Sequence, residues 1–155
     1  EGGKLMKNNK GITLIALVVT IIVLLILAGV SIAMLTGQNG ILNRGQEAAY
    51  KNAVTDAKDQ ISLKVAECIT NWNAKTYGGS TSTGITQTSL DAYIKDELDS
   101  VATSIGSKDV TITIPDVPTT SEAIIKIVSA KNSGISTSCK WKANGDLSSW
   151  TDVGF

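Results

Sequence analysis

Between Lys10 and Arg44 the chain carries no charged residue, and this gap constrains the fold more than any other feature of the sequence. The apolar part of the gap, residues 12–35, is 24 residues long. At about 1.5 Å per residue a helix of this length reaches about 36 Å, enough to cross the ~30 Å hydrocarbon core of a bilayer. Because Lys4, Lys7 and Lys10 precede it, the positive-inside rule predicts a single span with a cytoplasmic N-terminus.

Three other kinds of N-terminal apolar segment have sequence requirements of their own. A lipoprotein signal is excluded, because the small residues at 27–29 are followed by Val30 and not by cysteine. A conventional signal peptide remains open, with a small-x-small site at residues 31–33, although its apolar core is usually only about 7 to 15 residues long. A plain single-span anchor also fits the length.

The residue types of the chain argue against catalysis. The sequence has no histidine and two cysteines, so a zinc site of the usual ligands, a His-based triad and a Cys–His nucleophile are excluded. No glycine-rich phosphate-binding string occurs. The net charge is zero, and no dense basic patch points to nucleic acid. We therefore expect no enzyme, no cofactor and no bound metal.

The first residues suggest a start site inside the given sequence. Residues 1–5 back-translate readily to codons that contain the ribosome-binding string AGGAGG, a few nucleotides before the codon for Met6. We expect Met6 to be the first translated residue, and a genuine longer leader is the alternative.

A glycine-rich segment over residues 36–45 follows the apolar run and contains Gly37, Gly40 and Gly45. Each glycine costs a helix up to about 1 kcal/mol relative to alanine, so this segment is the weakest part of any continuous helix. Two interpretations stay open: a loop between anchor and domain, or a hinge that unwinds when the subunit assembles.

Residues 46–75 predict an amphipathic helix. Apolar side chains recur at spacings of three and four and form one stripe, which should bury against a sheet. The stripe consists of Tyr50, Val54, Ala57, Ile61, Val65, Cys68, Ile69 and Trp72.

Residues 76–155 predict a small globular head of mixed structure. A polar loop covers 76–88, and a short helix covers 89–98, with Ser89 as its N-cap and Leu90, Ile94 and Leu98 on one face. Strands are expected at 110–114 and 124–128, followed by a hairpin of 139–143 and 147–150 around the Asn-Gly turn signal at 144–145. The expected fold class is α+β, a long N-terminal helical spine packed against a small antiparallel C-terminal sheet.

Cys68 and Cys139 are the only thiols, and an even count in an exported domain favours a disulfide. Such a bridge would close a loop of about 70 residues and add roughly 4 kcal/mol to the stability in the chain-entropy model. Two buried free cysteines are the alternative, because Cys68 lies on the apolar stripe. The three tryptophans, Trp72, Trp141 and Trp150, are expected in the core or on a sheet face and not as a ligand platform.

The string Lys10-Gly11-Ile12-Thr13-Leu14-Ile15 resembles the type IV prepilin signal. The glycine-rich run from Thr36 and the Gln-Glu-Ala-Ala string that follows it resemble pilin-like proteins of Gram-positive bacteria, and the resemblance covers about residues 7–58. It implies that a prepilin peptidase cuts between Gly11 and Ile12, beside Lys10, and removes the leader 1–11. The new terminus would be Ile12, where the family usually has a methylated phenylalanine.

The resemblance also implies how subunits assemble, with one departure. The helix 12–35 would form the filament core, with Ile12, Leu14, Ile15, Ala16 and Gly29 at its contacts. Most pilins have glutamate at the fifth position after the cut, where it neutralises the terminal ammonium of a neighbouring subunit. Ala16 occupies that position here. The chain is therefore expected either to assemble by apolar packing alone or to serve as a tip subunit that needs no such partner.

These features together lead to an expected function as a structural subunit of a type IV pilus-like filament. The implied partners are other pilin subunits, a prepilin peptidase, a membrane platform with its assembly ATPase, and the bilayer before assembly. The subunit would wait in the cell membrane and then enter an extracellular fibre with a mechanical or adhesive role. The alternatives are a pseudopilin of a secretion or DNA-uptake machine and a membrane-anchored extracellular binding domain that does not polymerise.

Overall fold

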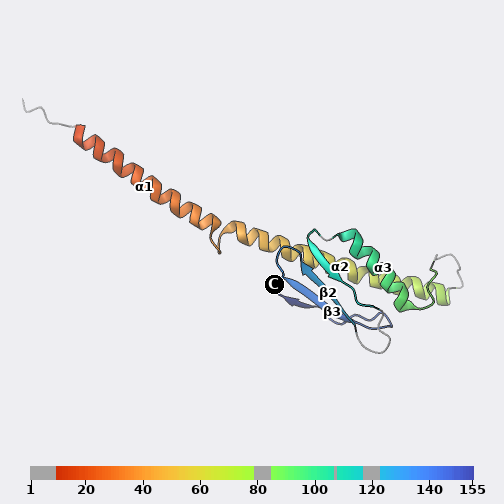
Figure 1. Ribbon diagram of the computed structural model, residues 1–155. Helices are drawn as coiled ribbons and strands as arrows, with labels where there is room; N and C mark the ends of the chain where they lie inside the picture. The colour runs from red at the N-terminus through yellow and green to blue at the C-terminus, as the bar shows by residue number, and fades with distance from the viewer. Residues whose placement is uncertain (1–9, 79–84, 107, 117–122) are drawn as a thin grey trace, which may run out of the picture. The chain divides into compact units, whose positions relative to one another are not determined.

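The computed structural model describes residues 10–78, 85–106, 108–116 and 123–155 (Figure 1). The chain divides into two compact units, Glu1–Gln46 and Glu47–Phe155, and each is described by itself. The leader up to residue 9, with the expected start at Met6, lies outside the described residues.

The first unit contains helix α1, Lys10–Thr36, and the start of helix α2, Ile41–Tyr77. Valine and isoleucine, which are not strong helix formers in water, make up much of α1. An apolar surrounding would favour the helix, because every backbone group must then pair within the segment. The interruption between the two helices covers residues 37–40. Gly45 is predicted from the sequence to be part of the hinge, but it lies within α2.

Helix α2 provides the largest part of the core of the second unit. The expected apolar stripe is confirmed: Val54, Ala57, Ile61, Val65 and Cys68 are buried, and the three aromatic or apolar side chains at the ends of the stripe are half-buried. The helix is longer than the 46–75 predicted.

Helix α3, Leu90–Ile105, packs beside α2 and continues past the predicted 89–98. Its buried face includes Tyr93, Ile94 and Leu98, as the spacing of three and four predicted. Ser89 is in the N-cap position with an extended backbone, but its hydroxyl makes no cap hydrogen bond. The helix ends at Gly106, whose φ of 77° is a conformation that favours glycine.

Four strands form one antiparallel sheet in the order β1-β2-β3-β4. They are β1 Val110–Thr113, β2 Ala123–Ser129, β3 Ser136–Trp141 and β4 Thr151–Val153. Inward side chains of the first three strands join α2 and α3 in one core, and Figure 1 shows β2 and β3 alongside α2. The predicted α+β class, a long helix packed against a small antiparallel sheet, is confirmed.

The predicted strand at 147–150 is wrong. Leu147 forms only a single bridge with Trp141, and the strand that pairs with β3 is β4, which begins four positions after Leu147. Two interactions account for the difference. The Ser148 hydroxyl accepts the Lys140 N–H at 2.9 Å, and Trp150 donates its indole N–H to the Ser62 hydroxyl of α2 at 3.0 Å, so its side chain lies against the helix.

The tryptophans are core residues, as expected. Trp141 is 0% exposed, and Trp72 and Trp150 are partly buried against the same cluster. The turn after Trp141 closes that core. Gly145, with a φ of 86°, lies so close to Ile69 and Ile94 that an added Cβ would be 3.0 Å from each side chain.

Candidate functional site

Helix α1 exposes its apolar side chains on every side. All residues from Gly11 to Thr36 are exposed, and the large apolar ones have exposed fractions between 45% at Val18 and 74% at Met34. A soluble helix buries at least one apolar stripe, and a helix that is apolar all round belongs in a core or a membrane. Within its own unit, no described residue covers α1, and its composition suits a surrounding of lipid or of other apolar helices.

The polar side chains of α1 are compatible with an apolar surrounding. Thr20 donates its hydroxyl to the Leu17 carbonyl at 2.7 Å, and Ser31 donates to Leu27 at 2.8 Å. Thr36 donates to Ile32 at 2.9 Å. In hydrocarbon an unpaired hydroxyl costs several kcal/mol, so these bonds within the helix remove the cost of placing it there.

Among the described residues, one helical region is long and apolar enough to cross a membrane, and the window that passes this test is 0% buried. It lies near the N-terminus, as the charge-free gap predicted. This much of the expected location is supported by length and composition.

The residues expected at the processing site and in assembly all lie on α1. Lys10 is its first residue, and Gly11 and Ile12 follow in the first turn. An added Cβ at Gly11 or Gly29 would meet no atom within 4 Å. The other assembly residues, Leu14, Ile15 and Ala16, are exposed in the second turn. The predicted contact residues therefore have open space around them.

The break after α1 is a tight turn that two glycines make possible. Gly40 donates its N–H to the Gly37 carbonyl at 2.7 Å, and the Asn43 side-chain amide donates to the same carbonyl at 2.9 Å. An added Cβ at Gly37 would lie 2.7 Å from the Ala33 oxygen, and one at Gly40 would lie 2.5 Å from the Leu35 oxygen. Both distances are too short for carbon and oxygen. Gly45, by contrast, has open space around it.

Substituting Gly40 with alanine should therefore open the turn, whereas Gly45→Ala should strengthen α2. The Arg44 N–H donates to the Gly40 carbonyl at 3.1 Å, so an opened turn exposes the bond after Arg44 to trypsin. We expect cleavage there to be faster in Gly40→Ala than in the unsubstituted chain. Gly45→Ala, favoured in a helix by about 1 kcal/mol, should be cut no faster. Equal rates in the two variants would contradict the steric role of Gly40.

Cys68 of α2 and Cys139 of β3 are free thiols in the structure, and both are buried. The disulfide favoured from the sequence is thus not present, and the alternative of two buried thiols describes the structure. Burial raises the pKa of the Cys68 thiol to about 11, with a smaller contribution from the Glu97 carboxylate. Burial also raises the pKa of Cys139 to about 12. Each cysteine acts as a small apolar side chain of the core.

We expect both thiols to resist alkylation at pH 8 in the folded chain and to react fully in denaturant without reductant. The thiolate is the reactive form, and a raised pKa keeps it scarce. Because these pKa values lie above the 9.0 of an unperturbed thiol, their contribution to stability is complete below pH 9 and is lost as the pH rises through 11. Counting alkylated cysteines by mass spectrometry checks the state. If the unreduced, denatured chain shows no reactive thiol, the two cysteines form a disulfide and the expectation is wrong.

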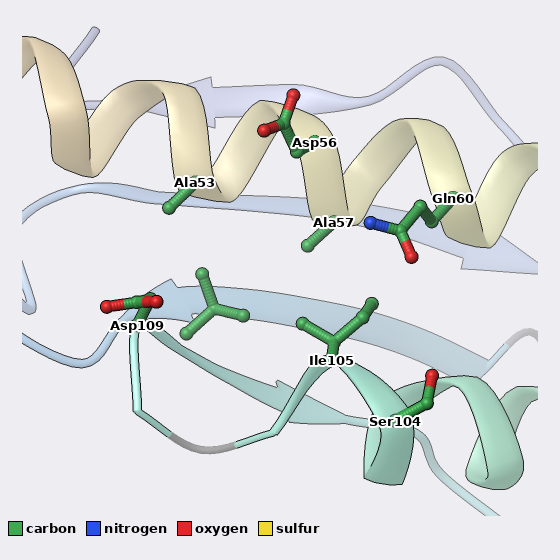
Figure 2. Close-up of a pocket in the computed structure, with 8 residues that line it drawn as sticks. Ala53, Asp56, Ala57, Gln60, Ser104, Ile105 and Asp109 are labelled. Atoms are coloured by element: carbon green, nitrogen blue, oxygen red, sulfur yellow. The ribbon is translucent and has the colours of Figure 1, made fainter.

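The head contains a cavity of about 310 Å³ between α2, α3 and the start of β1. Figure 2 shows Ala53 and Ala57 of α2 directed toward Ile105 of α3, so short side chains leave this space. Asp56 points away from Ile105 in the same view, and its carboxylate does not converge with that of Asp109. The sequence did not indicate Asp56 or Asp109, because isolated acidic side chains look like part of an ordinary solvated surface.

The described residues hold no group of three or more His, Cys, Asp or Glu side chains suited to a metal ion. The feature with the largest exposed apolar surface is α1. Comparison with protein-family models, with curated proteins and with solved structures gives no match to this chain.

Proposed function

We propose that this chain is a structural subunit of a type IV pilus-like extracellular filament. The observation that carries the proposal is α1, an apolar helix that is exposed on all sides and begins with a Lys10-Gly11-Ile12 string that resembles a prepilin cleavage site. A prepilin peptidase would remove the leader between Gly11 and Ile12. A membrane platform and its assembly ATPase would then move the subunit from lipid into the fibre.

Helix α1 suits both surroundings that this route requires. In the bilayer, lipid chains cover its side chains, and in the filament the α1 helices of neighbouring subunits replace the lipid. Lipid tails are as apolar as leucine, so the hydrophobic effect does not favour either state, and packing between helices decides assembly. The exposed Gly29 permits close approach of a neighbouring helix. Ala16 leaves no buried carboxylate to neutralise, and the contact rests on apolar packing.

Purifying surface fibres and sequencing the subunit's N-terminus tests the proposal. Ile12 as the first residue in long fibres is the expected result. Ile12 without long fibres would favour a pseudopilin of a secretion or DNA-uptake machine. An uncut leader in the membrane fraction would instead indicate an anchored extracellular domain that does not polymerise.

A further inference from the structure

An exposed leucine projects from the helix side of the head between acidic residues. Leu63 of α2 is 72% exposed, although it lies two residues from the buried Ile61. Asp59 and Glu67 are four residues before and after it, so they flank it on the same helix face. The groove beside Leu63 is lined by α2 residues and by Val101 of α3, with no strand residue. We call Leu63 with its flanking acids the helix ridge.

The helix ridge is negatively charged. Lys64 Nζ lies 3.1 Å from Glu67 Oε2 and 3.3 Å from Glu97 Oε2, so one lysine is shared between two carboxylates. Together with Asp59, these two carboxylates and Lys64 give the surface around Leu63 a net charge of −2. An apolar side chain within this field would select a partner that is apolar at its centre and basic around it.

The outer face of the sheet has these properties. Its side chains follow from the register, because directly paired residues point to the same face. Among the described residues of the four strands, the charged side chains on this face are Lys126 and Lys140, and the others are apolar or carry hydroxyls. A hollow of about 350 Å³ lies beside Ile124, which is 55% exposed, and Lys140 and Ser138 also line it. We call this surface the sheet hollow.

We propose that the helix ridge of one head docks into the sheet hollow of a second copy of this chain. Leu63 would lie against Ile124, and the acids beside Leu63 would face Lys126 and Lys140. The two surfaces lie on opposite layers of the head, since the core separates the helices from the outer face of the sheet. The contact is therefore heterologous, and repeated it builds an open helical array and not a closed dimer. A symmetric pairing of two ridges is disfavoured because it brings acids against acids.

This inference rests on the proposed function, because the docking needs little affinity of its own inside a filament. A contact made by a single leucine and a few charge pairs buries far less surface than the ~1,600 Å² that a typical stable complex buries. Subunits held together through α1 have a high effective concentration, at which a weak contact is occupied. The docking would fix the arrangement of heads along the fibre, and α1 would supply the affinity.

Cysteine cross-linking of the full chain in cell-surface fibres and membranes tests the docking. The double variant Leu63→Cys with Ile124→Cys should give a ladder of covalent oligomers after mild oxidation. Each single variant should remain monomeric, and a mixture of the two singles should stop at dimers. The control pairs Leu63→Cys with Thr103→Cys, an exposed position on α3, and should give no ladder. The unsubstituted chain reports any background from the two buried thiols.

Charge reversal provides a second measurement on residues that do not contribute to the core. Adding Glu67→Lys to the double cysteine variant should reduce the ladder roughly tenfold, since like charges then face each other. Lys126→Glu in the same chain should restore it. A structural effect of Glu67→Lys alone would not be repaired by a change on the opposite layer of the head.

The outcomes separate the docking from the proposed function. Fibres without a ladder overturn the docking alone, and dimers from Leu63→Cys by itself overturn its heterologous geometry. A ladder in membranes without fibres from the unsubstituted chain supports the docking and overturns the filament. Failure of Lys126→Glu to restore the ladder overturns the pairing of charges.

Discussion

Substituting Gly11 with valine is expected to leave all of the precursor uncut and to abolish fibres. The proposed cut follows Gly11, and a bulky side chain there should block the peptidase. The structure makes the result interpretable, because a Cβ at Gly11 would meet no atom within 4 Å. Valine at this position therefore leaves α1 undisturbed, and a loss of processing reports on recognition of the site.

Gly29→Val is the matched control, because Gly29 lies in the same helix and also has no atom within 4 Å of an added Cβ. The leader of this variant should be removed normally, although valine at position 29 should prevent close packing of α1 helices in the fibre. Gel mobility gives the state of the leader, and electron microscopy of the cell surface gives the fibres. Normal fibres from the Gly11→Val strain would rule out this cleavage site.

The largest effect on stability is expected for Ile61→Ala in the core of the head. Ile61 is 0% exposed on the face of α2 that packs against the sheet. Truncating a buried isoleucine costs about 2–5 kcal/mol through lost burial and the cavity left behind. Since the free energy of unfolding of a small domain is only about 5–15 kcal/mol, the substitution should remove a large part of the stability of the head.

Leu63→Ala is the control, because it removes a side chain of the same size from the same helix at a position that is 72% exposed. A change within about 0.5 kcal/mol is expected there. Tryptophan fluorescence during urea unfolding of the full chain in detergent measures both variants, because all three tryptophans lie in the second unit and α1 contributes none. Equal midpoints would contradict the placement of Ile61.

Much of the fold could be predicted because its residues follow regular patterns. The stripe of α2, the face of α3 and the alternation at Val110–Thr113 place apolar side chains at the period of their elements, and the run around Ile125 is rich in β-branched residues. The start of β3 could not be predicted, because Ser136 and Thr137 carry no apolar signal. Thr137 is nevertheless buried, and its hydroxyl donates to the Asp152 carboxylate, a partner 15 residues away.

The candidate site could likewise be predicted from the sequence only in part. The absence of charge between Lys10 and Arg44 was enough to predict the position of α1. The number of glycines after α1 was not enough to place the break, because spatial closeness decides which of them are required. Gly40 contacts the preceding turn and Gly45 does not, and sequence spacing carries no such information.

The contact between α2 and β4 sets a limit on when the head completes its folding. Lys58 Nζ lies 3.4 Å from Asp152 Oδ2, a pair separated by 94 positions in the chain. A ribosome that adds 5–20 residues per second needs about 5–20 s to synthesise that interval. The apolar stripe of α2 is covered only after β1, β2 and β3 have been made, late in this interval. The nascent chain must therefore be kept from aggregating until these strands are made, and contacts of such long range also slow the final folding step.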